Sequence, residues 1–259
     1  MSAPLLQLAD CTMQFGGLKA VANLDLVVGA GELVGLIGPN GAGKTTVFNV
    51  VTGVYAPTAG RVTFDGRAIA GLKANRIACA GITRTFQNIR LFPRLTCLDN
   101  VAVAAHPHRK AGMWSAVFRT PGFLADEAAL RRQAMDMLEV LGLADHADAL
   151  AIGLPYGQQR RLEIARALAG KPRLLLLDEP AAGLNPQESE DLMRLILEIR
   201  RRFSLTILLI EHDMKVVMGI CERIAVLDYG VKIAEGGPDE IRRDPRVIEA
   251  YLGEESVHA

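Results

Sequence analysis

The chain lacks an excess of either charge, a long apolar run and any C-x-x-C pair. Lysine plus arginine and aspartate plus glutamate number 29 each, so bulk charge gives no attraction to nucleic acid, although a local basic patch stays possible. The longest apolar stretches, such as residues 205–210, are far too short to span a bilayer. The cysteines, Cys11, Cys79, Cys97 and Cys221, are scattered, which predicts reduced structural thiols instead of disulfides or metal ligands.

The N-terminus also lacks the basic-then-apolar pattern of a signal peptide. We therefore expect a protein that is made and kept in the cytosol and that reaches any membrane through partners. A length of 259 residues suits one large α/β domain, or one domain with a subdomain. The hydrophobic content of 50% is enough for a sizeable core.

One glycine-rich turn organises the chain, because it joins an apolar strand pattern at residues 32–37 to an apolar-periodic helix pattern at 47–51. Glycines allow a backbone to wrap a polyphosphate, and the amide groups and positive end of the following helix then face the anion. The turn fits the phosphate-binding pattern G-x-x-x-x-G-K-[ST] and reads Gly38, Pro39, Asn40, Gly41, Ala42, Gly43, Lys44, Thr45 and Thr46. Lys44 would reach the β- and γ-phosphates, and the Thr45 hydroxyl would bind the Mg²⁺ that bridges them. A chance lysine in a glycine-rich turn is the alternative, but the flanking strand and helix favour a nucleoside triphosphate site.

Ahead of this loop, short strands are expected at residues 5–8 and 24–28, the second with alternating apolar and polar residues. Phe15 lies between them in a glycine-flanked turn. It is either a core aromatic, the commoner fate of a lone phenylalanine, or a face that stacks on a nucleotide base. Spacing alone leaves both interpretations open.

The middle of the chain has almost no strand pattern. Helices are expected at residues 98–105, capped by Thr96, and at 126–141, with Asp126 as N-cap and Gly142 just past the end. This block predicts an all-helical insert in an otherwise α/β chain.

Two later helices have clear beginnings. Pro155 and Gly157 break the chain ahead of one helix, whose N-terminus is a second potential anion site and weak evidence by itself. Asn185, Pro186 and Glu188 suit the N-cap, first and third positions of the other.

Residues 173–178 form an apolar run that leads into two carboxylates. Its four leucines suit a central parallel strand buried on both faces, and α/β sheets bind ligands at the carboxyl ends of such strands. Asp178 would hold the Mg²⁺ shell, through water or indirectly, while Glu179 would orient and polarise the attacking water. His212 follows another buried strand pattern and would meet the γ-phosphate at the same edge. Without the phosphate loop, an acid pair at an ordinary turn and an ordinary histidine would be the simpler interpretations.

These ordered features resemble those of an ATP-binding cassette ATPase over essentially the whole chain, from Leu5 to Leu252. The resemblance implies a single α/β domain at 1–259: a P-loop NTPase (RecA-like) core with an antiparallel β subdomain at 1–87 and 171–259, and an α-helical subdomain insert that carries a signature motif at 88–170. It also implies ATP and Mg²⁺ as cofactors.

In that family two cassettes meet head to tail, and each ATP lies between one chain's phosphate loop and the other chain's signature. By this resemblance Phe15 stacks on the base, and Gln87 touches Mg²⁺ or the attacking water and relays nucleotide state to a membrane partner. Gln87, Glu179 and His212 form the implied catalytic set, with Thr45, Gln87 and Asp178 at the metal. Asn185 stands where the loop that crosses the dimer usually has aspartate.

The implied signature departs from the family's usual L-S-G-G-Q. It is formed by Leu154, Pro155, Tyr156, Gly157 and Gln158. Pro155 lacks the hydroxyl and the amide N–H that would face the other chain's γ-phosphate, although Gly157 and the helix N-terminus survive. A lost charge-assisted hydrogen bond is worth roughly 1.5–3 kcal/mol, or about 10- to 150-fold. We therefore expect the nucleotide site that this signature completes to be weaker. We expect an intact signature on a different, partner ATPase to complete the other site.

Residues 15–21, 84–92, 154–163, 210–214 and 250–253 are similar to those of branched-chain amino acid importers, in the larger of their two ATP-binding subunits. The resemblance implies a second ATPase (heterodimer or homodimer), two integral-membrane permeases, indirectly a periplasmic solute-binding protein, no nucleic acid, and a peripheral position on the inner face of the cell membrane. Alternatives are a urea, amide or other amino acid importer and a lipopolysaccharide-type exporter. A soluble cassette acting on nucleic acid or ribosomes fits less well, because the chain has one cassette and no heptad run.

Overall fold

The computed structural model describes residues 4–105, 118 and 120–255. Its centre is a six-stranded sheet of order β10-β9-β3-β8-β7-β6, in which only β10 runs antiparallel to its neighbour. The strands are β3 (Leu33–Ile37), β6 (Ile82–Arg84), β7 (Leu174–Asp178), β8 (Thr206–Ile210), β9 (Arg223–Asp228) and β10 (Val231–Gly236). Every residue of β3, β7 and β8 is buried, as expected for apolar parallel strands covered on both faces.

A second sheet, of order β2-β1-β4-β5, is antiparallel throughout. It consists of β1 (Pro4–Phe15), β2 (Leu18–Gly29), β4 (Ala59–Phe64) and β5 (Arg67–Ala68). The first two strands extend well beyond the expected residues 5–8 and 24–28. Register shifts interrupt their pairing between Leu8 and Gln14, and such bulges break the apolar–polar alternation on which the shorter boundaries depended.

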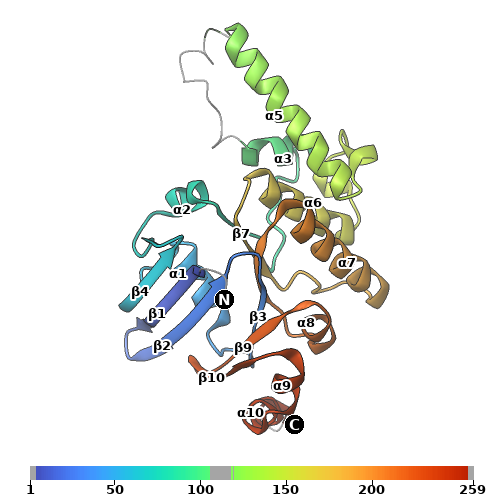
Figure 1. The fold of residues 1–259 in the computed structure, drawn as a ribbon. Helices are drawn as coiled ribbons and strands as arrows, with labels where there is room; N and C mark the ends of the chain where they lie inside the picture. Colours follow the sequence, from blue (N-terminus) through green and yellow to red (C-terminus); the bar gives the residue numbers. More distant parts are fainter. Residues whose placement is uncertain (1–3, 106–117, 119, 256–259) are drawn as a thin grey trace.

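The helices α3 (Cys97–Ala105), α5 (Pro121–Val140) and α6 (Tyr156–Ala169) lie between β6 and β7 in the chain and gather at one end of the molecule. Figure 1 shows them away from the C-terminal helices α9 (Pro238–Arg243) and α10 (Pro245–Glu255). Further helices in the described parts of the chain are α1 (Lys44–Val51), α2 (Ala74–Ala80), α7 (Pro186–Phe203) and α8 (Met214–Ile220), and 3₁₀ turns occur at Ala144–His146 and Ala151–Gly153.

The N-cap predicted for α5 is wrong. The helix begins at Pro121, and the Thr120 hydroxyl accepts a hydrogen bond from the Phe123 amide at 3.4 Å. Asp126 therefore lies inside the helix. The sequence marks the true start by Thr120 followed by Pro121, an N-cap residue and a proline at the first helical position. Gly142 does take the left-handed conformation, with φ of 68°, just past the end.

The caps predicted for α3 and α7 are confirmed. Thr96 accepts from the Asp99 amide at 3.0 Å, and Asn185 accepts from the Glu188 amide at 2.9 Å. Glu188 in turn accepts from the Asn185 amide at 3.0 Å, which completes a capping box.

Two cores cover the two faces of the central sheet. Leu174 and Leu176 of β7 belong to a core shared with β1, β2, β4 and α1. Leu175 and Leu177 belong to a core formed with α3, α5, α6, α7 and α8. Alternate residues of this strand thus point into opposite cores, which confirms the prediction from its leucine run. The carboxyl end of β7 is consequently fixed from both sides.

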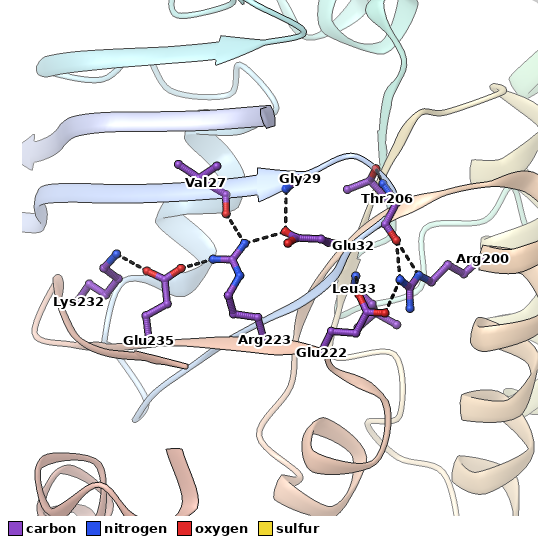
Figure 2. Close-up of polar contacts among 11 residues, drawn as sticks. Val27, Gly29, Glu32, Leu33, Arg200, Thr206, Glu222, Arg223, Lys232 and Glu235 are labelled. Atoms are coloured by element: carbon purple, nitrogen blue, oxygen red, sulfur yellow. Dashed lines mark hydrogen bonds and ion pairs between the residues drawn. The ribbon is translucent and has the colours of Figure 1, made fainter. Parts of the chain in front are cut away.

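Charged groups fasten the two sheets together at the start of β3 (Figure 2). Arg223 of β9 donates to the Val27 carbonyl at 2.6 Å and to Glu32 at 2.7 Å, and it also pairs with Glu235. Glu32 accepts from the Gly29 amide at 2.7 Å. Burial raises the pKa of Glu32, but the Gly29 amide and the Arg223 guanidinium outweigh it and hold that pKa below its ordinary value.

The four cysteines are free, as predicted, and Cys11, Cys97 and Cys221 are buried. Burial raises the pKa of Cys11 to about 11 and that of Cys221 to about 12, so these thiols stay protonated. Within the parts of the chain that the structure describes, no helix has the length and apolar character needed to cross a membrane.

Candidate functional site

The phosphate-loop residues connect β3 to α1 in a conformation that demands glycine. Gly38, Gly41 and Gly43 have φ values of 146°, 78° and 101°. A Cβ at Gly38 would lie 2.0 Å from the Leu227 carbonyl oxygen, and one at Gly43 would lie 2.4 Å from the Ala20 carbonyl oxygen. The predicted strand, turn and helix are thus all present, and the loop backbone lies tightly against β9 and β2.

Lys44 is the first residue of α1 and is 8% exposed. Its Nζ donates to the carbonyl oxygens of Gly38 at 2.5 Å and Pro39 at 2.8 Å. The ammonium group therefore lies inside the curve of the loop, where a polyphosphate bound to the amides would meet it. Thr45 is exposed and Thr46 is half-buried in the same first turn.

Four neighbouring strands bring the other predicted residues to the same edge of the sheet. The loop follows β3, His212 follows β8, Asp178 ends β7, and Gln87 comes shortly after β6. Because these strands are parallel, their carboxyl ends share one edge, which is where α/β sheets place ligands.

Glu179 is the meeting point of the predicted catalytic residues. The Gln87 side-chain amide donates to Glu179 Oε2 at 2.7 Å, and His212 Nδ1 lies 3.6 Å from the same oxygen. Glu179 has a φ of 46°, a left-handed conformation that is uncommon for a side chain other than glycine, and its amide donates to the Ile210 carbonyl at 2.9 Å. The turn that follows β7 thus directs the Glu179 carboxylate toward Gln87 and His212.

Asp178 is held by a group that the sequence patterns did not reveal. Arg84 of β6 donates to Asp178 Oδ2 at 2.6 Å, and the two side chains are 6% and 5% exposed. Arg84 also donates to Asn49 of α1 at 2.7 Å, and its guanidinium lies 5.3 Å from the Phe48 ring centroid and 5.0 Å from that of Phe86. An arginine at the end of a short strand pattern was the signal in the sequence, and the pairing of β6 with β7 comes from the fold.

Glu211 is a second residue that sequence reasoning missed. Its fully buried carboxylate accepts from the amides of Ala181 at 2.8 Å, His212 at 3.1 Å and Asp213 at 3.4 Å. Burial raises the pKa of Glu211 despite these hydrogen bonds. The Glu211 carboxylate joins the His212 loop to the segment after Glu179. The sequence signal for this role was the place of Glu211 directly after an apolar strand.

The donor set at this edge suits Mg²⁺. A hydroxyl of Thr45, a carboxylate of Asp178 and a side-chain carbonyl of Gln87 are hard oxygen ligands, which that ion prefers. Over the described ranges no cluster of three or more His, Cys, Asp or Glu side chains could hold a metal. The three oxygen donors fit an ion that takes its remaining ligands from phosphates and water, as is usual for Mg²⁺ at nucleotide sites.

Phe15 ends β1 and is 42% exposed, which excludes the core interpretation. Its ring contacts Tyr55 edge to face, with centroids 5.1 Å apart. An exposed face remains for the stacking role, which stays a prediction.

The signature residues lie at the start of α6. Pro155 is the N-cap, with no side-chain hydrogen bond to the helix, and Tyr156 is the first helical residue. Leu154 is buried, whereas Pro155 is exposed and Tyr156 is 45% exposed. Gly157 and Gln158 are half-buried in the first turn. They precede α6, whereas the phosphate loop precedes α1, so the two sets of residues lie at the starts of different helices.

Comparison with known proteins agrees with this geometry. A family model described as "ABC transporter" matches residues 21–182, and one described as "Branched-chain amino acid ATP-binding cassette transporter" matches residues 231–257. The high-affinity branched-chain amino acid transport ATP-binding protein LivG of Salmonella typhimurium is 51% identical over 98% of this chain and 100% of the relative. The high-affinity branched-chain amino acid transport ATP-binding protein BraF of Pseudomonas aeruginosa is 50% identical over the same shares.

Solved structures give the same result. The ADP conformation of MJ1267, an ATP-binding cassette of an ABC transporter, superimposes with a TM-score of 0.85 at 31% identity and covers 98% of this chain and 100% of its own. MJ0796, a bacterial ABC transporter cassette solved as a dimer, gives a TM-score of 0.76 at 28% identity, covering 90% of this chain and 98% of its own. The chain belongs to the ABC transporter family, as one of its ATP-binding cassettes, and the predicted fold class is confirmed.

Proposed function

We propose that this chain hydrolyses ATP to energise high-affinity import of branched-chain amino acids through partner permeases. The convergence of Gln87 and His212 on Glu179, beside the phosphate loop, is the observation that carries the hydrolytic part. LivG and BraF, which are about 50% identical to this chain over their full length, are branched-chain amino acid transport ATP-binding proteins, and this similarity supports the cargo.

In this mechanism the loop amides and Lys44 hold the phosphates, and the exposed Phe15 face stacks on the base. Thr45, Asp178 and Gln87 would hold Mg²⁺, and the ion would supply neutralisation of the phosphate charge. Glu179 orients and polarises the attacking water. Gln87 and His212 hold the Glu179 carboxylate in position relative to the γ-phosphate. Positioning and charge neutralisation are the main needs of phosphoryl transfer, and these residues supply both.

The partners follow from an incomplete site. The chain's own signature, from Leu154 to Gln158, completes a nucleotide site on another cassette, so we propose a dimer with a second ATPase subunit. Two permeases carry the cargo, a periplasmic solute-binding protein delivers it, and the cassette lies peripherally on the inner face of the membrane. Within it, residues 88–170 form the helical subdomain, 1–87 and 171–259 form the nucleotide core, and Asn185 lies in the loop that crosses the dimer.

Transport by the reconstituted complex tests the function. The chain is purified with its permeases and second ATPase, placed in liposomes with the solute-binding protein, and assayed for ATP-driven uptake of labelled leucine, isoleucine and valine. We expect uptake that requires Mg²⁺ and ATP and is lost in Glu179→Gln. Uptake of other amino acids or amides instead of these would overturn the cargo, and export of a lipid-linked substrate would overturn the direction.

A second measurement tests the altered signature. ATP turnover by the purified homodimer is compared with turnover by the mixed dimer. We expect the mixed dimer to be faster, because Pro155 lacks the hydroxyl and N–H of the usual serine. Equal rates would remove the proposed asymmetry without affecting the transport function.

A further inference from the structure

A buried ion pair on α6 lies behind the site described above. Arg160 and Glu163 are one helical turn apart, their side chains are 0% and 1% exposed, and Arg160 Nη1 is 3.1 Å from Glu163 Oε2. Removing two charges from water costs more than their attraction returns unless further hydrogen bonds satisfy them. Arg194 and Asp191 on α7 have the same spacing but are exposed, as is usual for a pair with a local role only. The buried α6 pair therefore needs further hydrogen bonds to satisfy its charges.

Those groups are the backbone atoms on both sides of Gln87. Arg160 Nη1 donates to the Phe86 carbonyl at 2.8 Å, and Arg160 Nη2 donates to the Gln87 carbonyl at 2.9 Å. Glu163 Oε1 accepts from the amides of Phe86 at 3.3 Å and Arg90 at 3.2 Å. The segment that carries Gln87 is thus hydrogen-bonded to both charged side chains of the α6 pair, Arg160 and Glu163.

Tyr156 connects this pair to the signature. Its hydroxyl accepts from Arg160 Nη2 at 3.0 Å. Its ring lies against Gly183, where a Cβ would be 3.1 Å from Tyr156 Cε1, in the loop between Glu179 and α7. One side chain thereby touches both the guanidinium behind Gln87 and the loop that follows Glu179. A glycine at this position would make neither contact.

We propose that Tyr156, Arg160 and Glu163 are positioning residues that couple the signature end of α6 to the Gln87–Glu179 contact in the same chain. The proposal rests on the proposed function, since it concerns ATP hydrolysis in a cassette dimer. When nucleotide bound to the partner engages the start of α6, any shift of that helix moves Arg160 and, with it, the backbone of Gln87. The substitution of tyrosine for glycine in the signature thus provides a connection between the two ATP sites.

Steady-state ATP turnover of the reconstituted complex tests the connection. Tyr156→Phe keeps the ring on Gly183 and removes only the hydroxyl, so we expect kcat to fall about 5- to 10-fold, the worth of one hydrogen bond. KM for ATP should change less than twofold, because the phosphate loop is untouched. Arg160→Lys should lower kcat further, since an ammonium cannot reproduce the guanidinium's several directed bonds.

A double-mutant cycle with Gln87→Ala separates positioning from general structure. If Tyr156 acts through Gln87, adding Tyr156→Phe to Gln87→Ala should lower kcat less than twofold further, because the contact it supports is already gone. Tyr229→Phe, at an 88% exposed tyrosine, and Arg194→Lys, in the exposed pair, are the matched controls and should leave kcat unchanged. Effects that multiply fully in the double mutant would overturn the proposal.

Hydrogen exchange tests the geometry without hydrolysis. The amides of Phe86 and Arg90 donate to Glu163, so in the full chain both should exchange at least about 5-fold faster in Arg160→Lys than in the wild type. Unchanged exchange, or wild-type kcat in folded Tyr156→Phe, would overturn the proposal while leaving the ATPase function standing. If the wild-type complex itself hydrolyses no ATP, the proposed function fails first.

Discussion

Arg84 Nη2 and Asp178 Oδ2 lie 2.6 Å apart in a nearly dry contact between β6 and β7. The pair places a permanent positive charge beside the carboxylate that we assign to the Mg²⁺ shell. It also links that carboxylate to the phosphate-loop helix, because Arg84 donates to Asn49 of α1. Arg84 therefore holds both the Asp178 carboxylate and the helix that follows the phosphate loop.

Arg84→Ala should destabilise the chain by about 3–5 kcal/mol, because it leaves Asp178 buried without its partner. For a chain of this size the melting temperature should fall on the order of 10 °C. Mg²⁺ with ATP should restore part of the loss, since the bound cation then faces the carboxylate. Melting with and without Mg²⁺-ATP measures both effects. Arg131→Ala, in an exposed pair with Asp99, is the control and should change little; an equal loss in both variants would contradict the support role.

Glu179→Gln should reduce ATP turnover by at least about 100-fold, because an amide cannot act as a base toward the attacking water. ATP binding should persist, since the loop amides and Lys44 are unchanged. Turnover measured alongside binding of labelled ATP distinguishes the two steps. The exposed Glu198→Gln on α7 provides a charge-matched control. Retained hydrolysis in Glu179→Gln would remove this residue from its role.

Gly43→Ala should destabilise the fold by more than about 2 kcal/mol and abolish ATP binding, because φ of 101° is unfavourable for alanine. The new methyl group would also lie 2.4 Å from the Ala20 carbonyl oxygen. Gly122→Ala in α5 meets no atom within 4 Å and should be neutral or stabilising by up to about 1 kcal/mol. Thermal melting and nucleotide binding compare the pair, and similar behaviour of the two variants would refute the steric argument.

The location of the site at the carboxyl edge of the central sheet could be predicted from the sequence, because the motifs that mark it are local. A glycine-rich turn after one apolar strand and an acid pair after another are readable in short windows, and parallel strands bring their ends together. Gln87 was assigned through the family resemblance, since nothing in its own neighbourhood marks it. The strand lengths of β1 and β2 were underestimated because bulges interrupt the alternation that defines a strand in sequence.

The supporting charges could not be predicted in the same way. Arg84 and Asp178 are 94 residues apart, and Glu163 lies 77 residues from the Phe86 amide that it accepts from. Such contacts depend on how helices and strands pack, which spacing along the chain does not encode. A charge inside an apolar stretch, or directly after one, is the signal that remains: Glu163 stands between Leu162 and Ile164, and Glu211 directly follows Ile210.

Acid should selectively weaken the contact between the sheets at Glu32. Its pKa in the folded protein is below the ordinary value of 4.5, so its ionised form stabilises the fold. That contribution is fully present above about pH 4.5 and is lost as the pH falls through the lower folded pKa, because protonation then weakens the bond to Arg223. Arg223→Gln should therefore cost about 2 kcal/mol at pH 7, and the difference from the wild type should shrink below pH 4.5. Urea unfolding at pH 7 and at successive steps below 4.5 measures this, with Arg131→Gln as the exposed control. A difference that stays constant with pH would show that Arg223 acts through the Val27 carbonyl instead of through the carboxylates of Glu32 and Glu235.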